Sequence, residues 1–225
     1  MNNKSHKYVA LVLTFILIMS VCIFWCAEKS GMFIDEIYTY GLSNSSYAPF
    51  IQNVKDGDMI DKQFKRAEFF NYLTVTSDEN KFDFASVYYN QTKDVHPPLY
   101  YWLINIASSL FPNMFSKWIG LGLNLLLYFM TLVVLYNLCN KLFKSKLISI
   151  MCLLMYGLST VGISTVLMIR MYILSTLLTV LLAYVIVELF DKNTKILFGF
   201  ASLIIFLGML THYYFVFYAF FACVL

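Results

Sequence analysis

Two adjacent acidic residues, Asp35 and Glu36, follow shortly after a long apolar run from Tyr8 to Cys26. A carboxylate in such a place can act as a general base that takes the proton of an attacking hydroxyl group. Neighbouring residues of a helix or a strand point in different directions, so only one of the two acids can face a reactant. A structural interpretation stays open, in which both are solvated loop carboxylates or a charge pair at a helix N-terminus.

Four further polar residues stand next to apolar runs, namely Asp94, His96, Arg170 and His212. Arg170 is the only arginine outside the polar segment 27–117. Because a guanidinium can bind a phosphate through two parallel hydrogen bonds, Arg170 predicts a phosphate ligand. It could instead extend from the membrane to lipid headgroups. His96 precedes Pro97 and Pro98 and could merely cap the helix that these prolines begin.

The histidines and cysteines do not predict a metal site. His212 is as consistent with a satisfied residue at the membrane interface as with a ligand. No ligand spacing ties His96 to His212, so we predict no metal ligands. All five cysteines fall in apolar segments, and we expect them to be small core residues rather than a disulfide framework.

The elements that position these residues must be membrane helices, because 60% of the 225 residues are apolar, 13% are charged and the mean hydropathy is +0.70. Several apolar runs approach or exceed the roughly 20 residues that cross a bilayer. The predicted runs are Tyr8–Cys26, Trp118–Cys139, Leu147–Ile169, Met171–Phe190, Ile196–Leu210 and a last one from Tyr214. Arg170 predicts a tight turn between the third and fourth. The fold class is therefore an all-α integral membrane protein, a multi-span helical bundle.

The segment 27–117 is the only long polar stretch, and it holds eleven of the thirteen carboxylates against eight basic residues. We predict that it is a large first extracytoplasmic loop containing surface-lying helices. The run 8–26 before it is longer than a signal-peptide core and lacks a cleavage pattern, so we predict an uncleaved anchor. The net charge of +3 arises with lysines that flank the spans, so we expect no nucleic acid partner.

The short apolar stretch 98–111 either crosses the bilayer or lies along its surface. If it lies flat, the N-terminal lysines and the lysines of 141–146 and 192–195 are all cytoplasmic, as the positive-inside rule requires. If it crosses, the latter two groups fall outside. The flat arrangement also suits the aromatic run Tyr100–Trp102, which we interpret as interfacial anchors. The N-terminus is then cytoplasmic, and the candidate residues emerge on the non-cytoplasmic side.

Four ordered motifs resemble a known family. They are Phe33–Thr39 (FIDEIYT), Asp94–Tyr101 (DVHPPLYY), Arg170–Tyr172 (RMY) and Thr211–Tyr214 (THYY). In this order the motifs resemble membrane glycosyltransferases of the C-type (GT-C) fold. The nearest branch is the bacterial relatives of dolichyl-phosphate-mannose protein mannosyltransferases, of glycosyltransferase family 39/83 type, with lipid A aminoarabinose transferases as more distant cousins. The resemblance covers nearly the whole chain, and the ordered set is more specific than any one motif.

The resemblance implies a hexosyl or mannosyl transferase that moves a sugar, with inversion, from a polyprenyl-phosphate donor to an acceptor hydroxyl on the outer face of the membrane. It implies Asp35 as the base and Glu36 as a supporting acid. It also implies a set of substrate-binding residues, namely Asp94, His96, Arg170, Tyr172 and His212. The acceptor would be a protein, a lipid or a polysaccharide, and the location the bacterial plasma membrane.

No cofactor is expected beyond the donor substrate. Relatives often place polar or acidic residues before the Arg-x-Tyr motif, whereas Leu167–Ile169 stand there in this chain. An acidic partner or a divalent metal at that turn is therefore not expected.

Two other classes of function stay open, a membrane transporter and a membrane protein that binds a partner through 27–117 without catalysis. Transport sites usually place ionisable residues near the membrane midplane, often in repeated halves. Here the interiors of the apolar runs carry no charge, and we detect no internal repeat. We treat 1–225 as the N-terminal part of a membrane glycosyltransferase domain, because the last apolar run stops at Leu225 without a closing charge.

Overall fold

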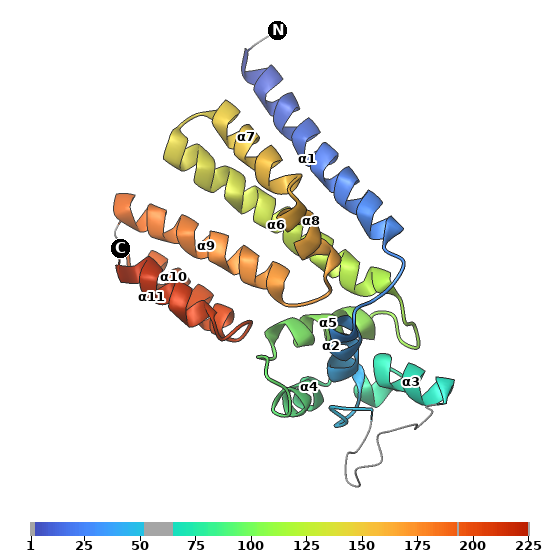
Figure 1. The fold of residues 1–225 in the computed structure, drawn as a ribbon. Helices are drawn as coiled ribbons and strands as arrows, with labels where there is room; N and C mark the ends of the chain where they lie inside the picture. The colour runs from blue at the N-terminus through green and yellow to red at the C-terminus, as the bar shows by residue number, and fades with distance from the viewer. Residues whose placement is uncertain (1–2, 52–64, 193, 225) are drawn as a thin grey trace. The chain divides into compact units, whose positions relative to one another are not determined.

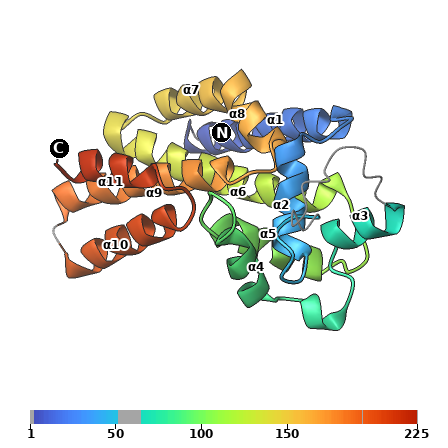
Figure 2. The ribbon, with the colours of Figure 1, turned by 60° about the horizontal axis from the view of Figure 1, so that its bottom comes forward.

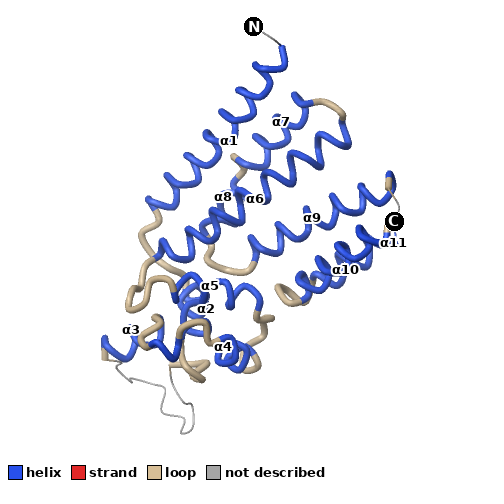
Figure 3. Tube along the Cα trace, turned by 180° about the vertical axis from the view of Figure 1, so that it is seen from behind, coloured by secondary structure: helices blue, strands red, loops and turns tan. Residues whose placement is uncertain are grey.

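A computed structural model describes residues 3–51, 65–192 and 194–224, and this part of the chain is helical without a strand (Figure 3). Residues 52–64, with three of the eleven carboxylates of the polar segment, lie outside the described part. The α-helices are α1 (Asn3–Glu28), α2 (Ile34–Asn44), α3 (Arg66–Leu73), α4 (Phe84–Gln91), α5 (Leu99–Ser109), α6 (Lys117–Phe143), α7 (Lys146–Gly157), α8 (Thr160–Leu167), α9 (Tyr172–Asp191), α10 (Lys195–Met209) and α11 (Phe215–Val224), and a 3-10 turn covers Asp78–Asn80.

The chain divides into two compact units, which we describe separately. The membrane unit comprises Met1–Ser30 and Asn124–Leu225, and the loop unit comprises Gly31–Leu123. The loop unit starts and ends within a few residues of the polar segment 27–117 predicted from sequence. Because the division falls inside α6, the first turns of that helix belong to the loop unit.

Three helices of the described chain are long and apolar enough to cross a membrane, namely Tyr8–Glu28, Lys117–Phe143 and Tyr172–Asp191. They confirm the predicted multi-span class. The expectation of one continuous helix over Leu147–Ile169 is wrong, because α7 and α8 are bent by 56° at a short break. The break has a local cause: the hydroxyl of Ser159 caps α8 by accepting a hydrogen bond from the backbone N–H of Gly162 at 3.0 Å.

Close packing fixes the broken pair against α1 (Figure 1). A Cβ atom at Gly157 would come within 2.6 Å of the side chain of Ile18, so α1 and α7 approach closely at this glycine. At the other end of the unit, Lys141 on α6 pairs with Glu188 at 2.5 Å and with Asp191 at 3.0 Å. These ion pairs join the C-terminal ends of α6 and α9.

In the loop unit, α2 packs against α3, α4 and α5 (Figure 2). Side-chain amides meet the carbonyl groups at the C-terminal end of α2, which have no partners within the helix. The amide of Asn90 on α4 donates to the carbonyls of Leu42 and Ser45 at 3.1 and 2.9 Å. The amide of Asn105 on α5 donates to the carbonyl of Ser43 at 2.8 Å. Hydrogen bonds to α2 therefore define the arrangement of this unit.

Two more side chains of α2 carry hydrogen bonds to distant parts of the loop unit. Asn44 donates to the hydroxyl of Ser108 at 3.0 Å. The fully buried phenol of Tyr40 donates to the carbonyl of Ser116 and accepts from the backbone N–H of Gly120, both at 2.8 Å. Burial is the main reason that the pKa of Tyr40 is raised, so the hydroxyl stays protonated and continues to donate.

Helix α5 corrects one prediction. Tyr100 and Tyr101 are fully buried, so they are core residues of the loop unit and not interfacial anchors. The reason is that α5 packs on α2 and α4, and its aromatic side chains fill the space between them. Trp102 is half-buried and donates from Nε1 to the carbonyl of Phe84 at 3.1 Å. With eleven residues, α5 is too short to span a bilayer, and its flat position on a membrane stays a prediction.

The cysteines are free thiols. Cys22, Cys26 and Cys139 are buried, as expected for small core residues. Cys223 is exposed on α11, and Cys152 is half-buried on α7. The prediction of a core position is therefore wrong for Cys223, because this end of α11 is exposed, as the neighbouring Phe220, Phe221 and Val224 also show.

The amide contacts of α2 generate a test of the fold. Asn105→Leu keeps the approximate side-chain volume and leaves the buried carbonyl of Ser43 without its donor, which costs about 1–3 kcal/mol. Thermal unfolding in detergent should shift down by about 2–4 °C for each kcal/mol lost. The control is Asn71→Leu on the exposed surface of α3, which should change the midpoint little. Equal midpoints for the two variants would contradict the assignment.

Candidate functional site

The first turn of α2 places its two adjacent acids in different environments, one buried and one exposed. Glu36 is fully buried, and its Oε2 accepts a hydrogen bond from the backbone N–H of Phe33 at 2.7 Å. This contact is typical of an acid at the third helical position that closes a helix N-terminus. Asp35 is exposed in the same turn. The expectation that the two carboxylates point in different directions is confirmed, and the exposed one is Asp35.

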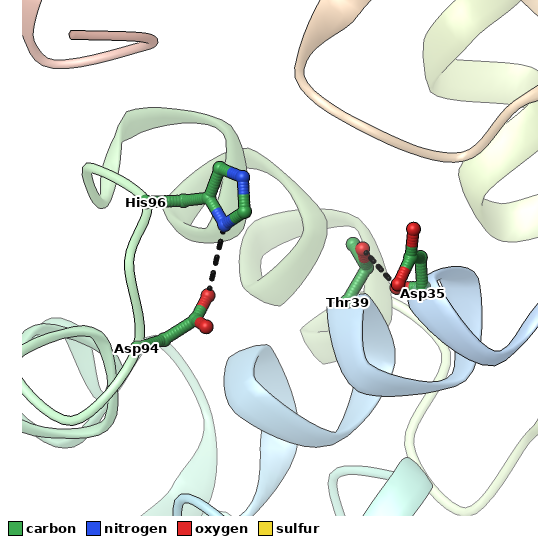
Figure 4. Close-up of polar contacts among 4 residues, drawn as sticks. All are labelled: Asp35, Thr39, Asp94 and His96. Atoms are coloured by element: carbon green, nitrogen blue, oxygen red, sulfur yellow. Dashed lines mark hydrogen bonds and ion pairs between the residues drawn. The ribbon is translucent and has the colours of Figure 1, made fainter.

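The residues after Asp35 hold α2 in a fixed register. The hydroxyl of Thr39 donates to the backbone carbonyl of Asp35 at 2.9 Å (Figure 4), and the hydroxyl of Ser43 donates to the carbonyl of Thr39 at 2.7 Å. Glu36, Thr39 and Ser43 are all buried. Because these residues form one side of α2, the helix cannot rotate without exposing them. Asp35 is thus carried by a rigid element, as a catalytic group requires.

Asp94 and His96 form a pair on the segment that connects α4 to α5 (Figure 4). The imidazole Nδ1 lies 3.1 Å from Oδ2 of Asp94, and both side chains are about one-fifth exposed. An ionised carboxylate only accepts hydrogen bonds, so beside an ionised Asp94 the Nδ1 atom is the donor of this contact. The residue at the N-cap of α5 is Pro98, whose side chain makes no capping hydrogen bond. The structure therefore brings together two of the predicted residues.

A buried phenol lies near this pair. The pKa of Tyr72 on α3 is raised, mainly by burial and further by the nearby Tyr38 and Asp94. Its hydroxyl donates to the carbonyl of Pro49 at 3.0 Å. Sequence reasoning did not find Tyr72, and no motif marks it. This hydrogen bond ties α3 to the segment that follows α2.

In the membrane unit, Arg170 lies in the tight turn between α8 and α9, as predicted from sequence. Its backbone N–H donates to the carbonyl of Met168 at 2.8 Å, two residues earlier. The side chain is largely buried, with 5% of its surface exposed, and it follows the fully buried Ile169. A buried guanidinium is costly unless it has hydrogen-bonding or anionic partners. Tyr172 begins α9 two residues later and is exposed.

His212 lies in the turn after α10, where a backbone contact selects the tautomer of its neutral ring. The backbone N–H of Tyr214 donates to Nδ1 of His212 at 3.2 Å. A neutral ring therefore carries its proton on Nε2 and can offer that N–H to an oxygen atom. The ring of His212 stacks on Tyr214 at 5.2 Å and lies 6.2 Å from the ring of Tyr172.

The structure thus joins Tyr172 and His212, which lie 40 residues apart in the chain, into one aromatic group with Tyr214. Tyr214 was missed as a member of this group. The signal that could have found it is the aromatic residue two positions after His212. Asp35, Glu36, Asp94 and His96 belong to the loop unit, and Arg170, Tyr172 and His212 belong to the membrane unit.

Among the described residues, no group of three His, Cys, Asp or Glu side chains lies close enough to hold a metal ion. The independence of the reaction from a metal stays a prediction.

Comparison with known proteins identifies the class. The family model described as dolichyl-phosphate-mannose-protein mannosyltransferase matches residues 95–225, which is more than half of the chain. The chain therefore belongs to this family, and it is a membrane protein of the mannosyltransferase-like glycosyltransferase class with a GT-C fold. His96, Arg170, Tyr172 and His212 fall inside the matched region, whereas Asp35 and Glu36 precede it. The comparisons with curated proteins and with solved structures found no match.

The buried contact of Glu36 generates a second prediction. Glu36→Ala removes the acceptor for the Phe33 N–H and should lower the free energy of unfolding by about 1.5–3 kcal/mol. Glu36→Gln keeps an acceptor oxygen and should lose less. The matched control is Glu68→Ala, because Glu68 occupies the same position in α3 with an exposed contact to Lys65 of 3.4 Å. Thermal unfolding in detergent measures all three, and an equal effect of the two alanine variants would refute a specific role of Glu36.

Proposed function

We propose that this protein transfers a sugar from a polyprenyl-phosphate donor to a hydroxyl group of an acceptor, on the non-cytoplasmic face of a membrane. The observation that carries the proposal is the exposed Asp35 on a rigid helix beside an acid that is buried in a cap. Membership of the mannosyltransferase family supports the lipid-linked donor and a protein as the acceptor. It also favours catalysis over the transport and partner-binding alternatives.

The proposed reaction is one direct displacement. The acceptor oxygen forms a bond to the anomeric carbon while Asp35 takes its proton, so the carboxylate acts as general base. The bond between the anomeric carbon and the phosphate oxygen breaks, and its electron pair leaves with the polyprenyl phosphate. Attack opposite to the leaving group inverts the anomeric carbon. Glu36 supports this step by keeping the first turn of α2 in place.

The leaving phosphate gains negative charge and needs donors. In our proposal, Arg170 binds the phosphate of the donor through its guanidinium group, which can supply two parallel hydrogen bonds. His212 is suited to donate a further hydrogen bond from Nε2, because Nδ1 is held by the backbone of Tyr214. Tyr172 would contribute its exposed ring beside His212.

Asp94 and His96 are proposed to bind the acceptor or the sugar. An imidazole whose Nδ1 proton is held by Asp94 has a fixed orientation, so its second nitrogen can accept a hydrogen bond from a hydroxyl group. The pairing of a histidine with a carboxylate is a common way to fix a ring for binding.

The role of Asp35 is tested by Asp35→Asn, which removes the base and hardly changes the volume. The rate of sugar transfer by the full-length protein should fall by about 10²–10⁴, while expression and the unfolding temperature stay unchanged. Asp78→Asn is the matched control, because Asp78 is a highly exposed acid of the same loop that pairs with Lys81. Transfer by Asp35→Asn at nearly the rate of the control would overturn the assignment.

The role of Arg170 is tested by comparing Arg170→Lys with Arg170→Ala. Lysine keeps the charge but loses the planar pair of donors, so both variants should lose about tenfold or more in donor affinity or rate. Donor titrations of the transfer reaction measure this loss. Full activity of Arg170→Lys would instead favour an anchor to lipid headgroups, since lysine reaches headgroups as well as arginine does.

A further inference from the structure

The α7–α8 break and the turn after α8 leave backbone carbonyl groups without partners inside a helix. Such groups are expensive within a membrane unless another part of the protein supplies a donor. Helix α6 supplies the donors at both places. The hydroxyl of Tyr128 donates to the carbonyl of Gly157 at 2.9 Å. The side-chain amide of Asn124 donates to the carbonyls of Val166 and Met168 at 2.9 and 2.8 Å.

Asn124 and Tyr128 act as one row on α6. They are four residues apart, so they lie on the same side of the helix. Both are fully buried. A Cβ atom at Gly162 would come within 2.8 Å of the Tyr128 hydroxyl and 2.4 Å of the Tyr156 carbonyl. Helix α8 therefore lies close against this row and cannot shift without a clash.

The contact of Asn124 reaches Arg170 through one atom. The carbonyl oxygen of Met168 accepts from the amide of Asn124, and it also accepts from the backbone N–H of Arg170 at 2.8 Å. The amide of Asn124 therefore holds the Met168 carbonyl, and this carbonyl in turn holds the backbone of Arg170. The neighbouring Ile169 and Met171 are fully buried, which restricts the turn further.

We infer that Asn124 is a positioning residue for Arg170: its amide holds the turn after α8 so that the guanidinium is presented to the donor phosphate in one orientation. This inference rests on the proposed function of Arg170. An asparagine suits the task because its single amide nitrogen carries two N–H groups for two carbonyls. Leucine would remove the donor of the Val166 carbonyl and leave the Met168 carbonyl with the Arg170 N–H alone, and serine could bind only one of the two.

The test uses Asn124→Leu in the full-length protein, with Asn137→Leu as the matched control. Asn137 is on the same helix, is exposed, and donates only to the carbonyl of Val133 in its own helix, at 2.9 Å. Asn124→Leu should raise the donor KM about ten- to a hundredfold and change kcat less, because a displaced phosphate ligand binds less well. Asn137→Leu should match the parent. Asn124→Ser, which keeps one donor, should fall between them and serves if the leucine variant does not fold.

The double variant with Arg170→Ala separates this inference from the proposed function. If Asn124 acts through Arg170, Asn124→Leu or Asn124→Ser adds no further loss in the Arg170→Ala background. A donor KM unchanged from the control in both Asn124 variants overturns the inference. A loss from the Asn124 change that multiplies with the loss from Arg170→Ala overturns it too. In both cases the phosphate role of Arg170 stands. An Arg170→Ala variant with normal donor kinetics overturns the phosphate role itself and the inference with it.

Discussion

The structure depends on one constraint: buried carbonyl groups at the ends and breaks of helices must find hydrogen-bond donors. In each unit, side chains of a neighbouring helix supply these donors. In the loop unit, Asn90 and Asn105 reach the C-terminal end of α2. In the membrane unit, Asn124 and Tyr128 reach the break and the turn around α8. Each of these contacts fixes the position of one element against another, most strictly within a membrane, where bulk water is not available as a donor.

The same constraint determines where reactive groups can stand. Helix α2 is held at its C-terminal end by amides and at its N-terminal end by Glu36. The first turn of α2 is therefore held by other residues, and the carboxylate of Asp35 can stay exposed. The turn after α8 is held in a similar way and carries Arg170. In both units, the residue proposed to touch the substrate stands next to residues that hold its backbone in place.

Much of this was predictable from the sequence, since hydrophobic runs and isolated charges are local signals. The helical membrane class, the turn at Arg170 and the divergence of Asp35 from Glu36 all followed from composition and from helix geometry. The break between α7 and α8 did not, because the run Leu147–Ile169 carries no charged residue and no proline, and a single serine such as Ser159 does not mark a helix start by itself.

The remaining differences arise from tertiary contacts that no sequence window contains. Tyr100 and Tyr101 look like interfacial residues until α2 and α4 cover them. Tyr172 becomes a neighbour of His212, 40 residues later in the chain, only through the packing of α9 against α10 and α11. The donors for the carbonyls of Val166 and Met168 come from a residue more than 40 positions earlier. Pairings of this kind are set by packing and leave no local pattern.

The most direct test of the account is the turnover of labelled polyprenyl-phosphate sugars by membranes that contain the full-length protein, with a panel of sugars and acceptors. One donor should release polyprenyl phosphate in step with the appearance of glycosylated acceptor, and the product should have the anomeric configuration opposite to that of the donor. Absence of release above the level of membranes containing Asp35→Asn, or a product that retains the configuration of the donor, would contradict it.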